Sequence, residues 1–337
     1  MAATGQAQRK RVSGARVLSG VQPSGVQHLG NYFGALRQFI ALQEGNRASY
    51  FVADLHSLTS IRDAKERRAL TRGVALDFLA LGVDPVRSIL YRQSDLPEVT
   101  ELAWILTTVT PMGLLARCVS YKEKLEAGLS PDHGLFAYPV LQAADILIWR
   151  ADWVPVGQDQ KQHLEVTRDI AVKFNLTYRE VLTLPEPYIL EDVAVVPGSD
   201  GRKMSKSYGN TIEMFAPEKA LRKQVMGIVT DSKGVDEPKD PDTSTIVALY
   251  SLLANPEERA ALAAAFRSGG TGYGDAKKAL LEKILAYFGE ARERRQRLEA
   301  DADTIEDVLQ DGAKRARAAV AELMNDVREA AGVARPK

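Results

Sequence analysis

Two lysines three residues apart are the most chemically informative feature of this chain. They stand in the run Lys203-Met204-Ser205-Lys206-Ser207, shortly after Gly198 and Gly201. Glycines and small hydroxyl side chains around a basic pair are typical of a mobile loop. Such a loop can close over a polyphosphate and neutralise the charge that develops between the α- and β-phosphates. A lysine-rich surface turn has a similar composition, so the interpretation depends on support from elsewhere in the chain.

A glycine-rich segment near the N-terminus gives that support. Residues 16–18 have the pattern of a short strand, and the apolar positions after the segment recur at helical spacing, at Leu36, Phe39, Ile40 and Leu42. The loop between strand and helix contains Gly25, Gly30, His28 and Asn31. The N-terminus of a helix exposes free N–H groups and holds phosphate well, and both polar side chains could donate hydrogen bonds to phosphate oxygens. A tight strand-to-helix loop with an incidental histidine is the alternative.

The elements around these two segments alternate between strand and helix. Strands are expected at 16–18, 49–54, 88–92 and 153–156, and helices at 64–81, 98–108 and 161–174. This order predicts an α/β fold with a Rossmann-like parallel sheet flanked by helices. Ligands of such folds bind at the carboxyl ends of the strands. The loops at 22–31 and 157–160 both follow predicted strands and are expected to meet there.

The pattern changes after about residue 211, where no further strand is expected. Apolar residues recur at helical spacing over 280–288 and again over 305–327. We therefore expect a flexible basic tail at 1–15, a catalytic domain at 16–210, and an all-helical domain at 211–337 whose C-terminal end can pack back on the catalytic domain. The glycine run at 269–274 follows a helix rather than a strand, which favours an inter-helix loop over a dinucleotide fingerprint.

Composition limits the remaining classes of function. Of the 337 residues, 45% are hydrophobic and 26% are charged, and no apolar run approaches the length of a membrane span. Residues 1–14 lack the apolar core of a secretory signal. Cys118 is the single cysteine, which excludes a disulfide within the chain and a four-cysteine zinc or iron–sulfur site. A protein of the reducing cytoplasm, without a membrane partner, is expected.

Formal net charge is zero, with 44 basic and 44 acidic residues. Binding of a nucleic acid would therefore depend on local basic runs. Three such runs are Arg9, Lys10, Arg11 and Arg16; Arg292, Arg294, Arg295 and Arg297; and Lys314, Arg315 and Arg317. A solvated helix face or a disordered tail is the alternative interpretation of each run.

Four segments together carry a family resemblance. The strand–Pro-Ser-Gly–His-Leu-Gly-Asn–helix segment resembles the "HIGH" signature of class I aminoacyl-tRNA synthetases, and residues 203–207 match their "KMSKS" loop letter for letter. Asn31 replaces the second histidine of the first signature, a variant common in tryptophanyl enzymes. Residues 138–147 and 154–163 resemble the tryptophanyl-tRNA synthetase family specifically. The resemblance spans about residues 16–330.

The resemblance implies a two-step ligase reaction. The carboxylate of L-tryptophan attacks the α-phosphate of ATP in line, pyrophosphate leaves, and the tryptophanyl group is transferred to tRNA(Trp). Positioning and charge stabilisation carry such a reaction, with Mg²⁺ on the phosphates and no metal ligands expected among the side chains. The family is dimeric, so a homodimer is implied, with the tRNA anticodon on the helical domain.

The resemblance also assigns roles to individual residues. The ATP site takes Gln22, Pro23, Ser24, Gly30, Asn31, Gly157, Gln158, Asp159, Val195, Lys203, Met204, Ser205, Lys206 and Ser207. Catalysis is assigned to Gln22, His28, Lys203, Lys206 and Ser207, with Lys124 as a further phosphate contact. The tryptophan site takes His56, Tyr138, Gln142, Asp145 and Gln160, of which Gln160 matches a position that holds the α-amino group.

Asp145 is also conspicuous on chemical grounds, because it interrupts the apolar run 143–149. A buried carboxylate is costly unless it is paired, and the lone N–H donor of an indole suits it as a partner. A site built to bond a polar substrate atom rejects analogues that lack that atom. The alternative is a helix carboxylate paired with a cation such as Arg150 or Lys161.

Two departures from the family pattern keep rival functions open. Gln142 stands where many tryptophanyl enzymes have methionine, and tyrosyl enzymes carry a glutamine before their own pocket aspartate. Leu55 replaces the glutamine of the usual Asp-Gln-His sequence, although His56 is retained. The rivals are a tyrosyl-tRNA synthetase, a small-molecule nucleotidyltransferase, and a non-catalytic regulator that binds tRNA or an amino acid. Pyrophosphate exchange with each amino acid would separate them.

Overall fold

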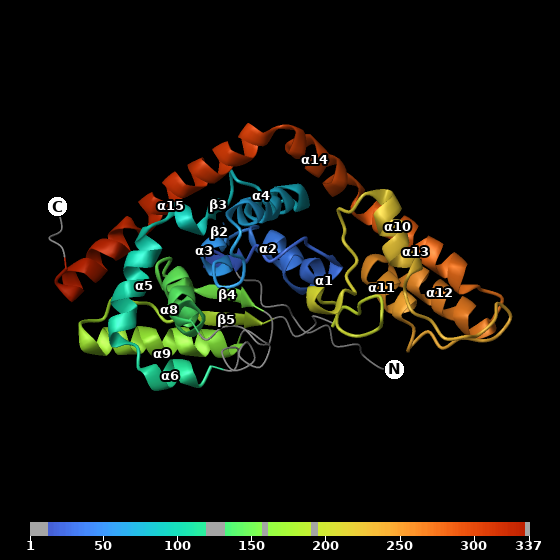
Figure 1. Ribbon diagram of the computed structural model, residues 1–337, viewed down its shortest axis with the longest axis horizontal. Coiled ribbons are helices and arrows are strands. Elements are labelled where there is room, and N and C mark those ends of the chain that lie inside the picture. The colour runs from blue at the N-terminus through green and yellow to red at the C-terminus, as the bar shows by residue number, and fades with distance from the viewer. Residues whose placement is uncertain (1–12, 119–131, 157–160, 190–194, 334–337) are drawn as a thin grey trace.

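A five-stranded parallel sheet forms the centre of the computed structural model, which describes residues 13–118, 132–156, 161–189 and 195–333. The strand order is β3-β2-β1-β4-β5 (Figure 1). The strands are β1 Arg16–Val21, β2 Arg47–Val52, β3 Ile89–Arg92, β4 Trp153–Val156 and β5 Glu186–Ile189. The predicted α/β class and parallel arrangement are confirmed. The fifth strand was not predicted, because Pro185 and Pro187 are unusual in strands; β5 tolerates its proline because it lies at the sheet edge.

Helices cover both faces of the sheet, and strand β2 shows how its side chains divide between them. Tyr50 is buried among residues of α2 (Arg37–Leu42) and α4 (Ala64–Leu81). Its neighbour Phe51 is buried in the opposite layer. That layer contains α5 (Glu98–Val109), α8 (His133–Leu147) and α9 (Lys161–Thr177). Burial on both faces explains why Tyr50, Phe51 and Val52 follow one another without an intervening charged residue.

Short elements follow the carboxyl ends of the strands. They are α1 (Leu29–Asn31), the π-helical turn η1 (Tyr32–Leu36), α3 (Asp54–Ser57) and the 3-10 turn η2 (Gln93–Asp95). A further short helix, α6 (Met112–Ala116), follows α5. Val21 of β1 lies beside Val52 of β2, and Val52 lies beside Arg92 of β3. The segments that contain His28, His56 and Gln93 therefore leave the sheet at the same edge.

A second lobe consists of helices, as the C-terminal pattern predicts. It contains α10 (Glu218–Met226), α11 (Thr245–Leu253), α12 (Pro256–Ser268) and α13 (Tyr273–Tyr287). The glycine run at 269–274 connects α12 with the start of α13, so the loop interpretation is confirmed. The core of this lobe also includes Leu29, Phe33 and Met204. Both sequence motifs are thus anchored in the helical lobe as well as at the sheet.

Two last helices lead from the helical lobe back to the sheet. Figure 1 shows α14 (Gly289–Ala300) and α15 (Ala302–Ala331) as an arch over the molecule. Helix α15 packs along β3, the edge strand. A Cβ atom on Gly312 would lie 1.8 Å from the carbonyl oxygen of Leu90, so only glycine permits this approach. The helix covers a sheet edge that would otherwise be open to pairing with another chain.

The arginines of two basic runs hold this arch in place. Arg292 donates to the carbonyl oxygens of Met214 and Ala216, and Arg294 donates to that of Ala80. On α15, Arg315 bonds the carbonyl of Pro85 and Arg317 that of Asp95. These guanidinium groups are therefore engaged within the chain and are not simply a solvated helix face. Within the described residues no helix is long and apolar enough to cross a membrane.

Candidate active site

A cavity of about 440 Å³ opens at the carboxyl ends of β1 and β4. Its polar lining includes five residues from three segments: Gln22, His56, Tyr138, Gln142 and Asp145. Four of them were assigned to the tryptophan site, and Gln22 to the ATP site. The structure therefore brings these sequence-predicted residues together, and Gln22 connects the glycine-rich loop to the cavity.

Asp145 lies on α8 with 1% of its surface exposed. The Nε2 atom of His56 is 3.0 Å from Asp145 Oδ2, and Gln93 Nε2 donates to both carboxylate oxygens at 2.9 and 2.8 Å. Burial raises the pKa of Asp145 above its ordinary value, although His56 and Gln93 both favour the charged form. Arg150 is not its partner, because it pairs with Asp326 at 2.6 Å.

Gln93 is a site residue that the sequence analysis missed. It is completely buried at the end of β3. Its Nε2 faces Asp145, while its Oε1 accepts hydrogen bonds from the backbone N–H groups of Leu55 (3.1 Å) and His56 (3.4 Å). One amide thus fixes both the carboxylate and the segment carrying its histidine partner. Its position directly after a buried strand was the available signal.

The remaining polar residues of the cavity form a second small group. The hydroxyl of Tyr138 lies 3.4 Å from Nε2 of His163, which also lines the cavity. Gln22 Nε2 is 3.4 Å from the carbonyl oxygen of His56. Gln142, the residue that departs from the tryptophanyl pattern, is part of the lining. Its side chain is therefore placed where it could affect the choice of substrate.

The two sequence motifs meet at the helical lobe. The Cδ atom of Lys206 lies 3.3 Å from the position that a Cβ atom on Gly25 would occupy. The backbone N–H of Gly30 is directed at Met204 Sδ, 3.3 Å away, and that of Leu29 donates to the carbonyl of Ile212. Both amides at the start of α1 are thus occupied by the chain itself, so a phosphate could bind Gly30 only if Met204 moved.

Burial shifts the pKa values of both basic side chains where the motifs meet, His28 and Lys206. Burial, with a contribution from Lys206, lowers the pKa of His28 to about 4. Burial also lowers the pKa of Lys206, although Asp77 and Glu213 favour its charged form. His28 is therefore neutral at pH 7. A phosphate group beside Lys206 would offset the cost of burying its ammonium group.

Asn210 organises the loop that carries the two lysines, and the sequence analysis did not single it out. It is 2% exposed. Its Oδ1 accepts from the N–H of Ser205 at 2.8 Å, and its Nδ2 donates to Asp200 Oδ1 at 2.7 Å and to the Lys203 carbonyl at 3.1 Å. A Cβ atom on Gly198 would lie 2.2 Å from Asn210 Nδ2, so a side chain at residue 198 would displace this amide.

The other predicted ATP residues differ in exposure. Ser24, Lys203 and Ser207 are exposed, whereas Pro23 is buried. Val195 is 67% exposed, and its neighbour Val196 accepts a backbone hydrogen bond from Met204. Asn31 accepts a hydrogen bond from the His28 N–H at 3.1 Å. Five predicted residues lie outside the described part of the chain: Lys124, Gly157, Gln158, Asp159 and Gln160.

The geometry combines two chemical environments. An open cavity contains a buried carboxylate in its lining, and a basic loop lies against a glycine-rich turn that also contributes Gln22 to the cavity. The first environment suits a flat apolar molecule with one N–H donor. The second suits a polyphosphate.

Known proteins are similar to this chain over nearly its whole length. The family described as tRNA synthetases class I (W and Y) matches residues 10–289. Tryptophan–tRNA ligase of Fusobacterium nucleatum is 53% identical over 94% of this chain and 98% of that protein. The enzyme of Rhodopirellula baltica is 52% identical over 94% and 99%. A solved structure of tryptophanyl-tRNA synthetase from Campylobacter jejuni, complexed with ADP and tryptophan, is 46% identical, with TM-score 0.91 and coverage of 94% and 100%.

Proposed function

The chain belongs to the class I tRNA synthetases for tryptophan and tyrosine, and we propose that it is a tryptophan–tRNA ligase. It activates L-tryptophan with ATP to tryptophanyl-adenylate and pyrophosphate, and then transfers the tryptophanyl group to tRNA(Trp). The observation that carries the choice of substrate is Asp145, a buried carboxylate in an otherwise largely apolar cavity.

The cavity accounts for selection of the amino acid. An indole ring would fill the apolar part, and its N–H would donate to Asp145. Gln93 and His56 hold that carboxylate in one orientation, so its acceptor lone pair is aimed before the substrate arrives. Preorganisation of this kind lowers the cost of binding. An amino acid without a suitably placed donor would leave the carboxylate buried with one unused acceptor position, which is unfavourable.

The motifs account for activation. The tryptophan carboxylate attacks the α-phosphate, the bond to the β-phosphate breaks, and the electron pair leaves with pyrophosphate. Lys206 and Lys203 stabilise the negative charge that accumulates on the leaving group. His28 is neutral and buried beside Lys206, so it acts as a hydrogen-bonding group toward the phosphates and adds no charge. ATP contacts by residues 157–159 and the α-amino contact by Gln160 belong to the same proposal.

The discriminating experiment is ATP–pyrophosphate exchange with each of the twenty amino acids, one at a time. Exchange with tryptophan alone, followed by charging of tRNA(Trp), is expected. Exchange with tyrosine would assign the chain to the tyrosyl enzymes and make Gln142 the decisive residue. An absence of exchange with every amino acid would favour a regulator or another transferase.

Mg²⁺ is proposed as the companion of the ATP phosphates. This ion usually keeps several waters and takes phosphate oxygens as ligands, so it does not need a cage of side chains. Removal of Mg²⁺ with a chelator should abolish exchange, and its return should restore it. Exchange that persists in excess chelator would contradict this part of the proposal.

A homodimer is also proposed, in the cytoplasm. Trp104 on α5 and Met112 at the start of α6 are exposed by 70% and 69%. Large apolar side chains of this exposure are typical of interface anchors. Light scattering of the wild-type protein should give a molar mass twice that of one chain. The Trp104→Asp variant should give a lower molar mass, because a charge at residue 104 would weaken the interface. A wild-type mass equal to one chain would contradict the dimer, and cell fractionation tests the location.

A further inference from the structure

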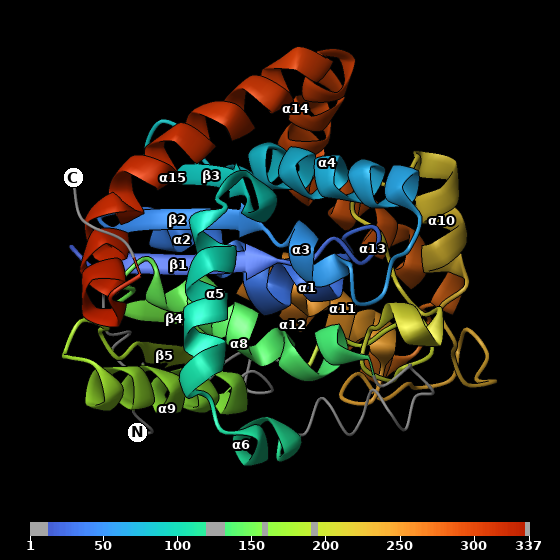
Figure 2. The same cartoon turned by 60° about the vertical axis from the view of Figure 1, so that its left-hand side comes forward.

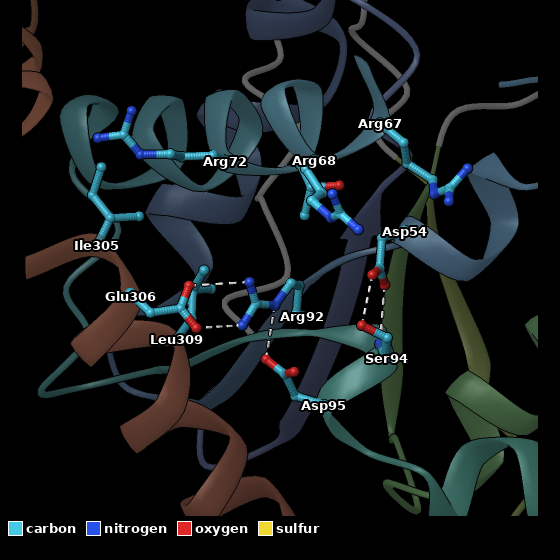
Figure 3. A pocket seen from close by; sticks show the side chains of 11 residues that line it. Asp54, Arg67, Arg68, Arg72, Arg92, Ser94, Asp95, Ile305, Glu306 and Leu309 are labelled. Atoms are coloured by element: carbon cyan, nitrogen blue, oxygen red, sulfur yellow. Dashed lines mark hydrogen bonds and ion pairs between the residues drawn. The ribbon is translucent and has the colours of Figure 1, made fainter. Parts of the chain in front are cut away.

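A second cavity, of about 480 Å³, lies between α4, η2 and α15. Figure 3 shows four arginines around it: Arg67, Arg68 and Arg72 along α4, and Arg92 at the end of β3. We call it the arginine pocket. It shares α3 with the tryptophan cavity, since Asp54 lines the arginine pocket and His56 lines the tryptophan cavity. Both cavities therefore lie at the carboxyl edge of the sheet, on either side of α3.

The acidic residues of the arginine pocket already have partners. Arg92 binds Glu306 through two nitrogens, at 2.6 and 3.0 Å, and binds Asp95 at 2.9 Å (Figure 3). Asp54 accepts from the backbone N–H and the hydroxyl of Ser94, at 3.0 and 2.6 Å. One wall is thus a network whose members are hydrogen-bonded to one another, with Arg92 shared between two carboxylates.

The α4 wall is different. Arg67 donates to the carbonyl of Ile61 at 3.0 Å. Arg68 and Arg72 make no hydrogen bond or ion pair with any described residue, and Nη2 of Arg72 is buried without an acceptor. A buried charged donor without an acceptor costs free energy, and such groups in folded proteins usually indicate a missing ligand or water. Two guanidinium groups of the pocket are therefore available to an anion.

We propose that the arginine pocket binds a backbone phosphate of the tRNA, near the end of the tRNA that receives the amino acid. This proposal rests on the ligase function. Guanidinium groups bind phosphate oxygens in pairs, with both charge and geometry matched. Arg68 and Arg72 are four residues apart on a helix, which separates them by about 6 Å along its axis and places them on one face. Such a row suits an extended polyanion.

The position of the pocket supports tRNA over a small phosphate compound. Arg68 is exposed, so a ligand held there can continue into solvent. Asp54, which lines the arginine pocket, and His56, which lines the tryptophan cavity, are two residues apart. An RNA chain bound at the arginine pocket would therefore lie beside the cavity from which the amino acid is transferred. The contact would position the tRNA without reading its sequence, since phosphates are common to every nucleotide.

The test compares the double variant Arg68→Gln/Arg72→Gln with wild type and with Lys65→Gln. Lys65 is exposed on the same helix outside the pocket, so its variant controls for one lost surface charge. Two activities are measured: tryptophan-dependent pyrophosphate exchange, which needs no tRNA, and charging of tRNA(Trp). Binding of tRNA(Trp) is titrated between about 50 and 200 mM salt, a range in which phosphate contacts change affinity strongly.

The double variant should keep wild-type exchange, bind tRNA(Trp) about tenfold or more weakly, and show a salt slope reduced by about one for each lost phosphate contact. Lys65→Gln should change neither the exchange nor the charging. Arg72→Lys, which keeps the charge but not the paired geometry, should lie between. Thermal unfolding of each variant confirms that it is folded.

An unchanged salt slope and unchanged charging in the double variant would overturn the proposal. A loss of exchange equal to the loss of charging would also overturn it, because the pocket would then serve ATP or pyrophosphate. Failure of the ligase function itself has a separate signature, since wild-type protein would then show neither exchange with tryptophan nor charging.

Discussion

A carboxylate, an imidazole and an amide decide the chemistry of the tryptophan cavity at the scale of single residues. Asp145 contributes the acceptor, while His56 and Gln93 fix its orientation. Gln93 cannot be replaced by a hydrocarbon without leaving both Asp145 and two backbone N–H groups with fewer partners. Buried polar networks of this kind are useful only when all members are satisfied.

Asp145→Asn tests the acceptor. The new amide places an N–H group against donors of Gln93 or His56 and loses the charge that attracts the indole N–H. Hydrogen bonds to charged groups contribute about 1.5–3 kcal/mol, so kcat/KM for tryptophan in the exchange reaction should fall roughly 10- to 150-fold. Gln142→Met, a neighbour in the same lining, should retain tryptophan exchange. An unchanged kcat/KM in Asp145→Asn would remove this residue from substrate recognition.

Burial of His28 predicts that the folded protein becomes less stable at acidic pH. Its pKa falls from 6.5 to about 4 on folding, mainly because of burial, so the unfolded chain binds a proton more readily between those values. The free energy of unfolding therefore decreases as pH falls from 6.5 toward 4. His28→Gln lacks this loss, and the wild type should lose about 2 kcal/mol relative to it over that interval. Denaturant unfolding at several pH values measures the difference; parallel curves would contradict the burial of a neutral His28.

At the scale of elements, the basic loop is held at both ends. Met204 inserts into the core of the helical lobe, and Asn210 ties Ser205, Lys203 and Asp200 together. The lysine side chains are left with more freedom than the backbone that carries them. A backbone fixed in this way gives both lysines defined starting positions for stabilising charge on a phosphate. A phosphate could reach the N–H of Gly30 only if Met204 moved.

Lys206→Ala should reduce the exchange rate by roughly two orders of magnitude or more, because charge on departing pyrophosphate is then less well stabilised. Binding of tryptophan, followed by fluorescence or calorimetry, should remain unchanged, since the cavity does not include this residue. Lys219→Ala is the matched control, an exposed lysine on α10. If Lys206→Ala exchanged pyrophosphate at the wild-type rate, the loop would have no part in activation.

At the scale of the whole molecule, α14 and α15 hold the two lobes in one arrangement. Arg295 of α14 binds Asp77 of α4 at 2.8 Å and lies over the ring of Phe215. Asp77 is buried, and burial raises its pKa to about 6 in spite of Arg295. This contact is therefore a desolvated ion pair between the sheet lobe and the arch. Such pairs are costly to break by removing one partner.

Arg295→Met should destabilise the protein at pH 7.5 by up to about 3–5 kcal/mol, because Asp77 must then remain buried without its partner or take up a proton. The double variant Asp77→Asn/Arg295→Met should recover much of that loss, since no uncompensated charge remains. Chemical unfolding of the wild type, both single variants and the double variant gives the coupling energy. Additive effects of the two substitutions would show that the pair has no energetic coupling.

Patterns among neighbouring residues were sufficient to predict the parallel α/β class, the helical lobe and the two loops. Strand and helix periodicities and short motifs depend only on residues that are close together in the sequence. The family resemblance assigned His56, Tyr138, Gln142 and Asp145 to one site, and all four line one cavity. Strand β5 was missed because Pro187 within it and Pro185 just before it obscure the pattern. The arginines of α14 and α15 could not be distinguished from surface charges, since their acceptors lie up to 230 positions away.

The sequence by itself determined which chemical groups are present: two lysines and small hydroxyl residues in a basic loop, a histidine in a glycine-rich turn, and a carboxylate in an apolar run. The tertiary structure alone decided their partners. Gln93 and His56 reach Asp145 across 52 and 89 positions of chain, and Lys206 is brought to Gly25 through a separate lobe. Contacts between distant positions depend on how elements pack, which no short pattern records.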